Sequence, residues 1–266
     1  MPDLYNVENL HLSLPDMTRK PLFGPAPRIE ILKGLSFTIP KGEVLGIVGG
    51  SGSGKSTLGR ALIRLLEPSQ GRISFDGQDI SHLPEAALRP LRRRFQMIFQ
   101  DPMSSLNPRQ RVGQIIAAPL TLQGHVDPRG AAREALDLVG LGRSFASRYP
   151  HELSGGQRQR VGIARAIVLR PDFILADEIV SGLDVSSQAQ ILGLLEGLVK
   201  ELGLTLAFIS HDLSVIRRLC TRILVMHQGE IVENAATAEL FASPKADYSR
   251  ALLDAIPLPD PDQAWA

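Results

Sequence analysis

Short apolar runs, separated by longer helical patterns, organise most of the chain. Three of these runs are almost continuously apolar and cover residues 44–48, 173–176 and 206–209. Continuous apolarity is typical of strands that are buried on both faces of a parallel sheet. Polar residues follow each run directly, and ligands of open α/β sheets bind at the carboxyl ends of the strands. The pattern predicts an α/β fold with a mainly parallel sheet and a polar site along one edge.

Other segments predict the structure around this core. Residues 30–42 and 71–79 alternate between apolar and polar side chains, as antiparallel strands with one face in water do. Residues 223–233 place a turn between two apolar runs and predict a hairpin. The segment 15–27 holds four prolines and one glycine and is predicted to be a loop.

Residues from about 101 to 158 lack strong strand signals, and proline and glycine punctuate their helical patterns. We interpret them as a helical subdomain that is inserted into the sheet domain. The chain is thus expected to form one domain, 1–266, made of a core with an antiparallel β subdomain (1–100 and 159–240), the helical subdomain (101–158) and a short C-terminal tail (241–266).

The composition narrows the range of partners. The 266 residues are 44% hydrophobic, enough for a sizeable core, and the net charge is +1. Such a charge gives no basic field that would make nucleic acid or anionic lipid the obvious partner. The single cysteine, Cys220, cannot form an internal disulfide, and we expect it to be a small core residue. No run approaches the roughly 18 to 20 apolar residues that span a bilayer, so we expect a soluble cytoplasmic chain that can dock onto a membrane protein.

The loop after the first apolar run carries the strongest chemical signal. Its sequence fits the pattern G-x-x-x-x-G-K-[ST], directly after a predicted strand and before a predicted helix. Glycines let backbone N–H groups approach phosphate, Lys55 adds a positive charge for the β and γ phosphates, and the Ser56 hydroxyl can ligate Mg²⁺. A surface turn is the alternative, but the flanking strand and helix disfavour it. The residues expected to bind the nucleotide here are Gly49, Gly50, Ser51, Gly52, Ser53, Gly54, Lys55, Ser56 and Thr57.

Two further motifs supply charge and anion-binding groups. Asp177 and Glu178 end the second apolar run, where Asp177 would hold Mg²⁺ and Glu178 would polarise the attacking water. An acidic helix cap is the alternative for this pair. The segment Leu153-Ser-Gly-Gly-Gln157 is either a second anion cradle or an ordinary helix N-cap. Because it follows the first loop by about 100 residues, in a helical insertion, the simplest arrangement is that it binds the γ-phosphate held by a partner chain.

With these motifs, nearly the whole chain resembles the ATP-binding subunit of an ABC transporter, a P-loop NTPase with a RecA-like core. The motifs follow the family's order: Walker A, a Q-loop at Gln100, the LSGGQ signature, Walker B (173–177), a D-loop (181–184) and a switch histidine, His211. The resemblance implies that Gln100 ligates Mg²⁺ and links the attacking water to the membrane subunit, and that His211 contacts the γ-phosphate and orients Glu178. It also assigns nucleotide contacts to Ser154, Gly155, Gly156, Gln157 and Asp184.

Finer blocks at residues 21–24, 100–108, 184–190 and 248–253 resemble the oligopeptide, dipeptide and nickel importer branch. This likeness implies an ATPase that energises uptake of peptides, nickel, opines or glutathione, with ATP and Mg²⁺ as cofactors. It implies a head-to-tail dimer with a second, related ATPase, two transmembrane permease subunits and, indirectly, a solute-binding protein, but no nucleic acid. The expected location is peripheral, on the cytoplasmic face of the bacterial inner membrane.

The sequence departs from the family pattern in a few places. Ile179 stands where proline usually follows the catalytic glutamate, and Gly182 stands where alanine is common. The aromatic residue that stacks on adenine should lie near residues 12–14, yet the stretch 11–15 contains none. The chain also stops before the cysteine-containing extension of many relatives, so an iron–sulfur cluster is not expected.

Two other classes of protein remain as alternatives. A soluble ABC-type ATPase acting on DNA or ribosomes would carry long coiled coils or two nucleotide-binding domains, which 266 residues do not accommodate. A plain P-loop kinase would have no use for the signature. We interpret the run Arg92-Arg93-Arg94 as a solvated face rather than a phosphate-backbone contact.

Overall fold

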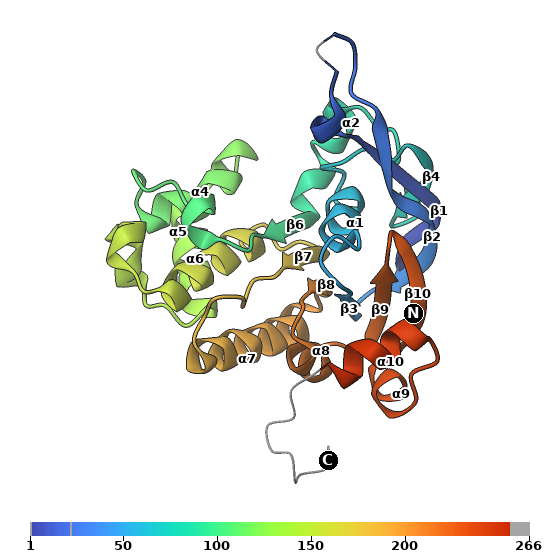
Figure 1. Cartoon of the computed structure of the whole chain (residues 1–266). Coiled ribbons are helices and arrows are strands. Elements are labelled where there is room, and N and C mark those ends of the chain that lie inside the picture. Colours follow the sequence, from blue (N-terminus) through green and yellow to red (C-terminus); the bar gives the residue numbers. More distant parts are fainter. Residues whose placement is uncertain (1, 22, 256–266) are drawn as a thin grey trace.

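A six-stranded sheet lies at the centre of the computed structural model, which describes residues 2–21 and 23–255 (Figure 1). In spatial order its strands are β10 (Glu230–Ala236), β9 (Arg222–His227), β3 (Val44–Val48), β8 (Thr205–Ile209), β7 (Phe173–Asp177) and β6 (Phe95–Ile98). All neighbours run parallel except β9 and β10, which form the predicted antiparallel hairpin. Every residue of β3, β7 and β8 is buried, which confirms that the continuously apolar runs are the central strands.

Helices cover both faces of this sheet. The helices concerned are α1 (Lys55–Leu62), α6 (Gly155–Ile167), α7 (Val185–Leu202) and α8 (Leu213–Leu219). Side chains alternate along β3, so Leu45 and Ile47 share a hydrophobic cluster with α1, while Val44 and Val48 share one with α6, α7 and α8. Cys220, directly after α8, is buried in the cluster that contains Val44 and Val48, as expected from the sequence.

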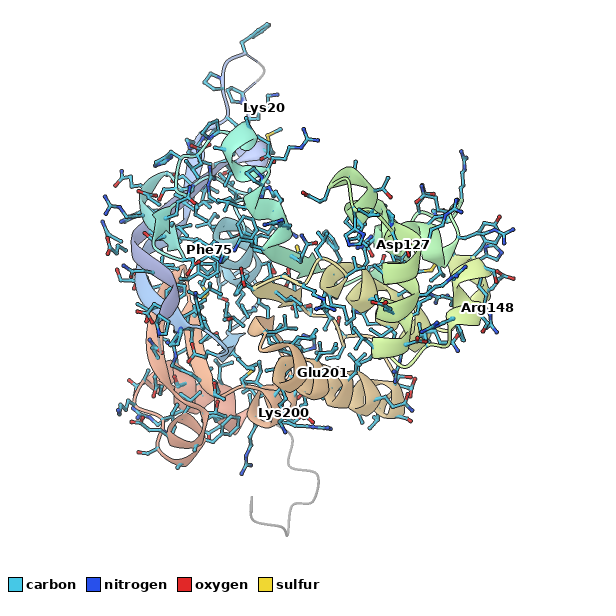
Figure 2. All side chains as sticks on the ribbon, turned by 180° about the vertical axis from the view of Figure 1, so that it is seen from behind. Lys20, Phe75, Asp127, Arg148, Lys200 and Glu201 are labelled. Carbon is cyan, nitrogen blue, oxygen red and sulfur yellow. The ribbon has the colours of Figure 1, made fainter. Side chains whose placement is uncertain are left out.

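A smaller antiparallel sheet packs on the α1 side of the core. Its order is β2 (Arg28–Pro40), β1 (Asp3–Pro15), β4 (Gln70–Phe75) and β5 (Gln78–Asp79). The predictions for residues 30–42 and 71–79 are thereby confirmed, whereas β1 was not predicted. The loop between β1 and β2 contains one short 3₁₀ helix, η1 (Met17–Arg19), and projects from the sheet lobe, with Lys20 near its tip (Figure 2).

The second lobe is helical and holds α4 and α5 at the left of Figure 1. It contains α3 (Pro102–Ser105), α4 (Val112–Leu122), α5 (Pro128–Leu138), η3 (Arg143–Ser147) and η4 (Pro150–Glu152), followed by α6. Figure 2 shows the two lobes from behind, with Phe75 in the sheet lobe and Asp127 and Arg148 on the helical lobe. Helix α6 is continuous across residue 158, so the boundary that we placed there falls inside a helix.

The remaining helices are short: α2 (Glu85–Leu88), η2 (Leu91–Arg93), α9 (Thr237–Ala242) and α10 (Asp247–Asp254). The predicted tail, 241–266, thus includes α10, while residues 256–266 lie outside the described part of the chain. None of the helices in the described ranges has the length and apolar character that crossing a bilayer needs. The architecture as a whole confirms the predicted fold class, a mainly parallel α/β core with an antiparallel β subdomain and inserted helices.

Candidate active site

The phosphate loop, residues 49–56, turns the chain from the end of β3 into α1. Gly49 has φ +148°, a conformation that L side chains rarely adopt, and a Cβ there would lie 2.2 Å from the carbonyl oxygen of Met226. Gly54, the N-cap residue of α1, lies in the left-handed region with φ +101°. Glycine is therefore required where the loop passes close to β9 and where the helix begins.

Lys55 is the first residue of α1, and its buried ammonium group lies within the loop. Its Nζ donates to the carbonyl oxygens of Gly49 and Gly50, both at 2.8 Å. Burial lowers the pKa of Lys55, and the negative charges of Glu178 and Asp177 oppose that shift. The first N–H groups of a helix have no partner within it and carry partial positive charge. The ammonium and these N–H groups together form a cradle for phosphate.

Ser56 and Asp177 place two oxygen ligands beside this cradle. The Ser56 hydroxyl on α1 donates to Oδ1 of Asp177 at 3.0 Å, and Asp177 is the last residue of β7. Burial raises the pKa of Asp177, while the Ser56 hydrogen bond partly offsets the shift. A buried carboxylate and a hydroxyl are hard donors, which suit a small divalent cation that is also bound by substrate phosphates.

Glu178 leaves β7 through an unusual backbone conformation. Its φ is +51°, and its N–H donates to the carbonyl oxygen of Ile209 at the end of β8. Such a left-handed residue costs about 1 to 3 kcal/mol and persists only where the surroundings fix it. The side chain meets two other predicted residues: Gln100 Nε2 donates to its Oε2 at 2.9 Å, and His211 Nδ1 lies 3.7 Å from its Oε1. Three separate loops thus meet at one carboxylate.

Ser181 also belongs to this cluster, although we did not assign it to the site. Its hydroxyl donates to the carbonyl oxygen of Glu178 at 2.7 Å, and its backbone N–H donates to the same oxygen at 3.1 Å. The Nε2 of Gln100 lies 3.5 Å from the Ser181 hydroxyl. The signal that points to Ser181 is its position as the first residue of the D-loop.

The other predicted residues of the loop differ in exposure. Ser51 and Gly52 are exposed to solvent, whereas Thr57 is half-buried in the first turn of α1. Ser53 is buried, and among the described residues its hydroxyl has no hydrogen-bond partner. The exposed tip of the loop is therefore open to a ligand, while its base is packed against the core.

The signature residues begin α6. Ser154 is the N-cap residue: its hydroxyl accepts from the N–H of Gln157 at 3.3 Å, and Oε1 of Gln157 accepts from the N–H of Ser154 at 3.0 Å. Gly155 and Gly156 lie near the segment that leads into α7. The structure therefore shows the N-cap that was one of the two interpretations, and a capped helix start can still bind an anion through its free N–H groups.

Asp184 caps the neighbouring helix, α7. Its carboxylate accepts from the backbone N–H of Ser187 at 2.9 Å and from the Ser187 hydroxyl at 2.6 Å. These hydrogen bonds lower the pKa of Asp184, and the one from the Ser187 hydroxyl has the largest effect. The predicted site residues thus form two groups, one around Lys55 and Glu178 and one at the starts of α6 and α7.

The described residues near positions 12–14, and the aromatic residues Tyr5 and Phe23, place no ring over the phosphate loop. Leu12 is fully buried, Leu14 is half-buried and pairs with the backbone of Ile29, and Phe23 is 92% exposed. Tyr5 is enclosed in the core, where its ring centroid lies 4.7 Å from that of Phe173. Phe23 therefore does not fold back over the site in this structure.

The arginine run 92–94 is not the solvated face that we expected. Arg92 donates to the carbonyl oxygens of Ile63 and Arg64 and pairs with Glu85. Arg94 bridges Asp76 and Asp172, and its guanidinium lies over the ring of Phe75. Two of the three side chains therefore tie parts of the sheet lobe together, because backbone carbonyls and carboxylates lie within reach.

Comparisons with known proteins identify the family. The sequence matches the protein family described as ABC transporter over residues 32–181. It is 51% identical to the oligopeptide transport ATP-binding protein AppF of Bacillus subtilis, over 86% of this chain and 71% of that protein. It is 48% identical to the oligopeptide transport ATP-binding protein OppF of Streptococcus mutans, over 90% of this chain and 79% of that protein.

Solved structures show the same fold. One is a dimeric post-hydrolysis state of the ATP-binding cassette MJ0796 bound to ADP and Pi, with a TM-score of 0.76 at 30% identity, covering 88% of this chain and 98% of that one. Another is cbiO1 from Clostridium perfringens, part of the ABC transporter complex cbiONQ. Its TM-score is 0.79 at 30% identity, and the match covers 91% of this chain and 92% of that one. The motifs, the fold and the relatives agree, and the chain belongs to the ABC transporter family, as a subunit that binds and hydrolyses ATP to support transport.

Proposed function

We propose that this chain powers the import of peptides or related small solutes, as one of two ATPases that dimerise head to tail beneath two transmembrane permease subunits. The observation that carries the proposal is the division of the site into two groups. Lys55 would bind the nucleotide and Glu178 would activate the attacking water, whereas the exposed start of the signature lies beside the D-loop and the first turn of α7. A partner ATPase would bring its own phosphate loop to this signature.

Mg²⁺ fits the oxygen donors that the chain presents. Ser56 and Asp177 would hold it, with the amide oxygen of Gln100 as a further ligand, in keeping with the preference of Mg²⁺ for carboxylate, hydroxyl and phosphate oxygens. When bound, the ion would neutralise charge on the β and γ phosphates. The ionised form of Asp177, which burial disfavours in the free protein, would then be stabilised by a positive neighbour.

Glu178 is the proposed general base. Its carboxylate is held between Gln100 and His211, so it can accept a proton from a water placed in line with the γ-phosphate. Lys55 would orient the transferred group and stabilise its charge, and His211 would orient the base and contact the γ-phosphate. Because Gln100 touches this carboxylate directly, a movement of its loop changes the position of the base.

A groove of about 400 Å³ beside the Gln100 loop is the proposed permease contact. Its lining includes exposed apolar side chains, among them Leu65, Phe99 and Leu122, and the half-buried guanidinium of Arg165. Phe99 directly precedes Gln100, so a short cytoplasmic helix of a permease in this groove would press on the active-site loop. Crosslinks from residues 101–108 to a permease are expected in the assembled transporter, and their absence there would contradict this contact.

The peptide class of solute is supported by the names of AppF and OppF, which are oligopeptide transport proteins. The proposed site of action is the cytoplasmic face of the bacterial inner membrane, where a solute-binding protein on the other side delivers cargo to the permeases. A role on nucleic acid finds no support, because Arg92 and Arg94 are engaged within the sheet lobe.

The test is reconstitution of the chain with its second ATPase, both permeases and the binding protein in liposomes. We expect slow ATP hydrolysis by the purified chain alone and faster hydrolysis in the assembly when the binding protein carries a peptide. Full activity of the monomer, independent of protein concentration, would refute the composite site. If nickel, an opine or glutathione stimulates ATP hydrolysis but peptides do not, the role in import stands and the assignment of peptides as the solute is wrong.

A further inference from the structure

A tyrosine near the C-terminal end of the described chain touches the phosphate loop. The backbone N–H of Gly50 donates to the hydroxyl of Tyr248 at 2.8 Å, across 198 residues of sequence. Tyr248 lies in the first turn of α10, and its ring packs on His227, the last residue of β9, with ring centroids 4.0 Å apart. Among the sequence motifs, Tyr248 belongs only to the block at residues 248–253 that resembles one importer branch.

The same peptide unit carries a second contact on its other side. No cis peptide bond occurs among the described residues, and in a trans peptide the N–H and the C=O point in opposite directions. The unit that joins Gly49 to Gly50 therefore presents its N–H to Tyr248 and its carbonyl oxygen to Nζ of Lys55, each at 2.8 Å. The hydroxyl of Tyr248 and the ammonium of Lys55 hold this peptide from its two sides.

This peptide needs such support because two glycines flank it. Without Cβ atoms, Gly49 and Gly50 allow the peptide between them to rotate with little steric resistance. Rotation would turn an N–H toward the Lys55 ammonium in place of the carbonyl oxygen that now accepts from it. Lys55 would then lose one of its two backbone acceptors, since Gly50 O is the only other acceptor that its Nζ has among the described residues.

We infer that Tyr248 is a positioning residue, which fixes the Gly49–Gly50 peptide and through it holds Lys55 ready for the phosphates of ATP. Helix α10 is itself anchored to the sheet. The buried carboxylate of Glu233 on β10 accepts from the N–H of Lys245 at 2.9 Å and from the N–H of Ala246 at 3.0 Å, directly before α10 begins. Helix α10 is thus a fixed support for the nucleotide site. This role depends on nucleotide binding alone and not on the proposed cargo.

The first test is Tyr248→Phe, which keeps the ring on His227 and removes only the hydroxyl. Equilibrium titration with ADP in the presence of Mg²⁺ should show a Kd about 3 to 10 times higher, as expected for the loss of one hydrogen bond. The KM for ATP should rise more than kcat falls. The matched control is Tyr5→Phe, because the Tyr5 hydroxyl is buried without a hydrogen-bond partner among the described residues. The Kd of the Tyr5→Phe protein for ADP should match that of wild type.

The second test asks whether the effect passes through Lys55. In a Lys55→Ala background, Tyr248→Phe should cause no further change in the Kd for ADP, because the side chain that it positions is absent. Thermal midpoints of Tyr248→Phe and Tyr5→Phe should both stay within a few degrees of wild type. The inference is overturned by an unchanged Kd in Tyr248→Phe, by an equal loss in the Lys55→Ala background, or by weaker binding that accompanies a lower midpoint.

Discussion

Replacement of Glu178 by glutamine isolates the proton-accepting role of this side chain. Glutamine has the same shape, and its amide oxygen can still accept from Gln100 Nε2, which now donates to Oε2 of Glu178 at 2.9 Å. The backbone strain at φ +51° is the same for both residues, because neither is glycine. Lys55 and Ser56, which are proposed to hold phosphate and Mg²⁺, are untouched. The change therefore removes the base and leaves the binding site in place.

The magnitude follows from the role of a general base. Such a group typically contributes about 10² to 10⁴ in rate. This corresponds to roughly 2.7 to 5.4 kcal/mol in the activation barrier. Phosphate release at saturating ATP and Mg²⁺ should fall by that factor in Glu178→Gln, measured in the presence of the partner ATPase. Equilibrium binding of ATP should stay within twofold of wild type.

A second glutamate serves as the control. Glu196 on α7 pairs with Arg218 at 2.8 Å in a half-exposed ion pair, and such pairs contribute little to stability. Glu196→Gln should therefore leave both binding and phosphate release unchanged. If Glu178→Gln releases phosphate within twofold of wild type while it binds ATP normally, another group accepts the proton and the assignment fails.

Four further substitutions test other parts of the site. Asp177→Asn should abolish Mg²⁺-dependent hydrolysis yet raise the thermal midpoint at pH 7, since burial raises the pKa of Asp177 and its ionised form destabilises the fold. That gain should shrink as the pH falls toward the usual aspartate pKa, because the buried group then becomes neutral. Gly49→Ala should weaken ADP binding, because the new Cβ would lie too close to the carbonyl oxygen of Met226. In denaturant titrations the same change should lower the free energy of unfolding by roughly 1 to 3 kcal/mol. Normal ADP binding would contradict this close approach. Leu14→Tyr should tighten ATP binding, since stacking of a base on an aromatic ring contributes about 1 to 3 kcal/mol. The wild-type protein should bind ATP and GTP with similar affinity. Phe23→Ala should change neither affinity, because Phe23 is exposed. A strong ATP preference in wild type that Leu14→Tyr does not improve would show that another group recognises the base.

The core of the fold could be predicted because its strands are buried on both faces. β3, β7 and β8 consist almost entirely of apolar residues, and no turn signal interrupts them. β1 could not be recognised from alternation, because its apolar positions change parity midway. Tyr5 and Val7 face the core from odd positions and Leu10 and Leu12 from even ones, with a register shift between them and Asn9 at φ +46°.

The residues of the site could be named from sequence, but their arrangement could not. Motif spacing pointed to Lys55, Asp177 and Glu178 because each follows or ends a strand of the same sheet edge. The left-handed conformation of Glu178 depends on a hydrogen bond to Ile209 on the neighbouring strand, which is a tertiary contact. The contact between Gly50 and Tyr248 links distant segments through α10, and no local pattern indicates it.

The pairing of β3 has a consequence for synthesis of the chain on the ribosome. β3 lies between β8 and β9. Contacts at the start of β3 join Gly42 to Thr205, 163 residues later, and Val44 to Thr221, 177 residues later. At roughly 5 to 20 residues per second, translation of the shorter interval takes about 8 to 33 s. During that time the apolar strand has neither of its sheet neighbours and is open to chaperones. A nascent chain that ends before β8 is therefore expected to retain no ATP, so the nucleotide stabilises only chains in which β8 and β9 have already been synthesised.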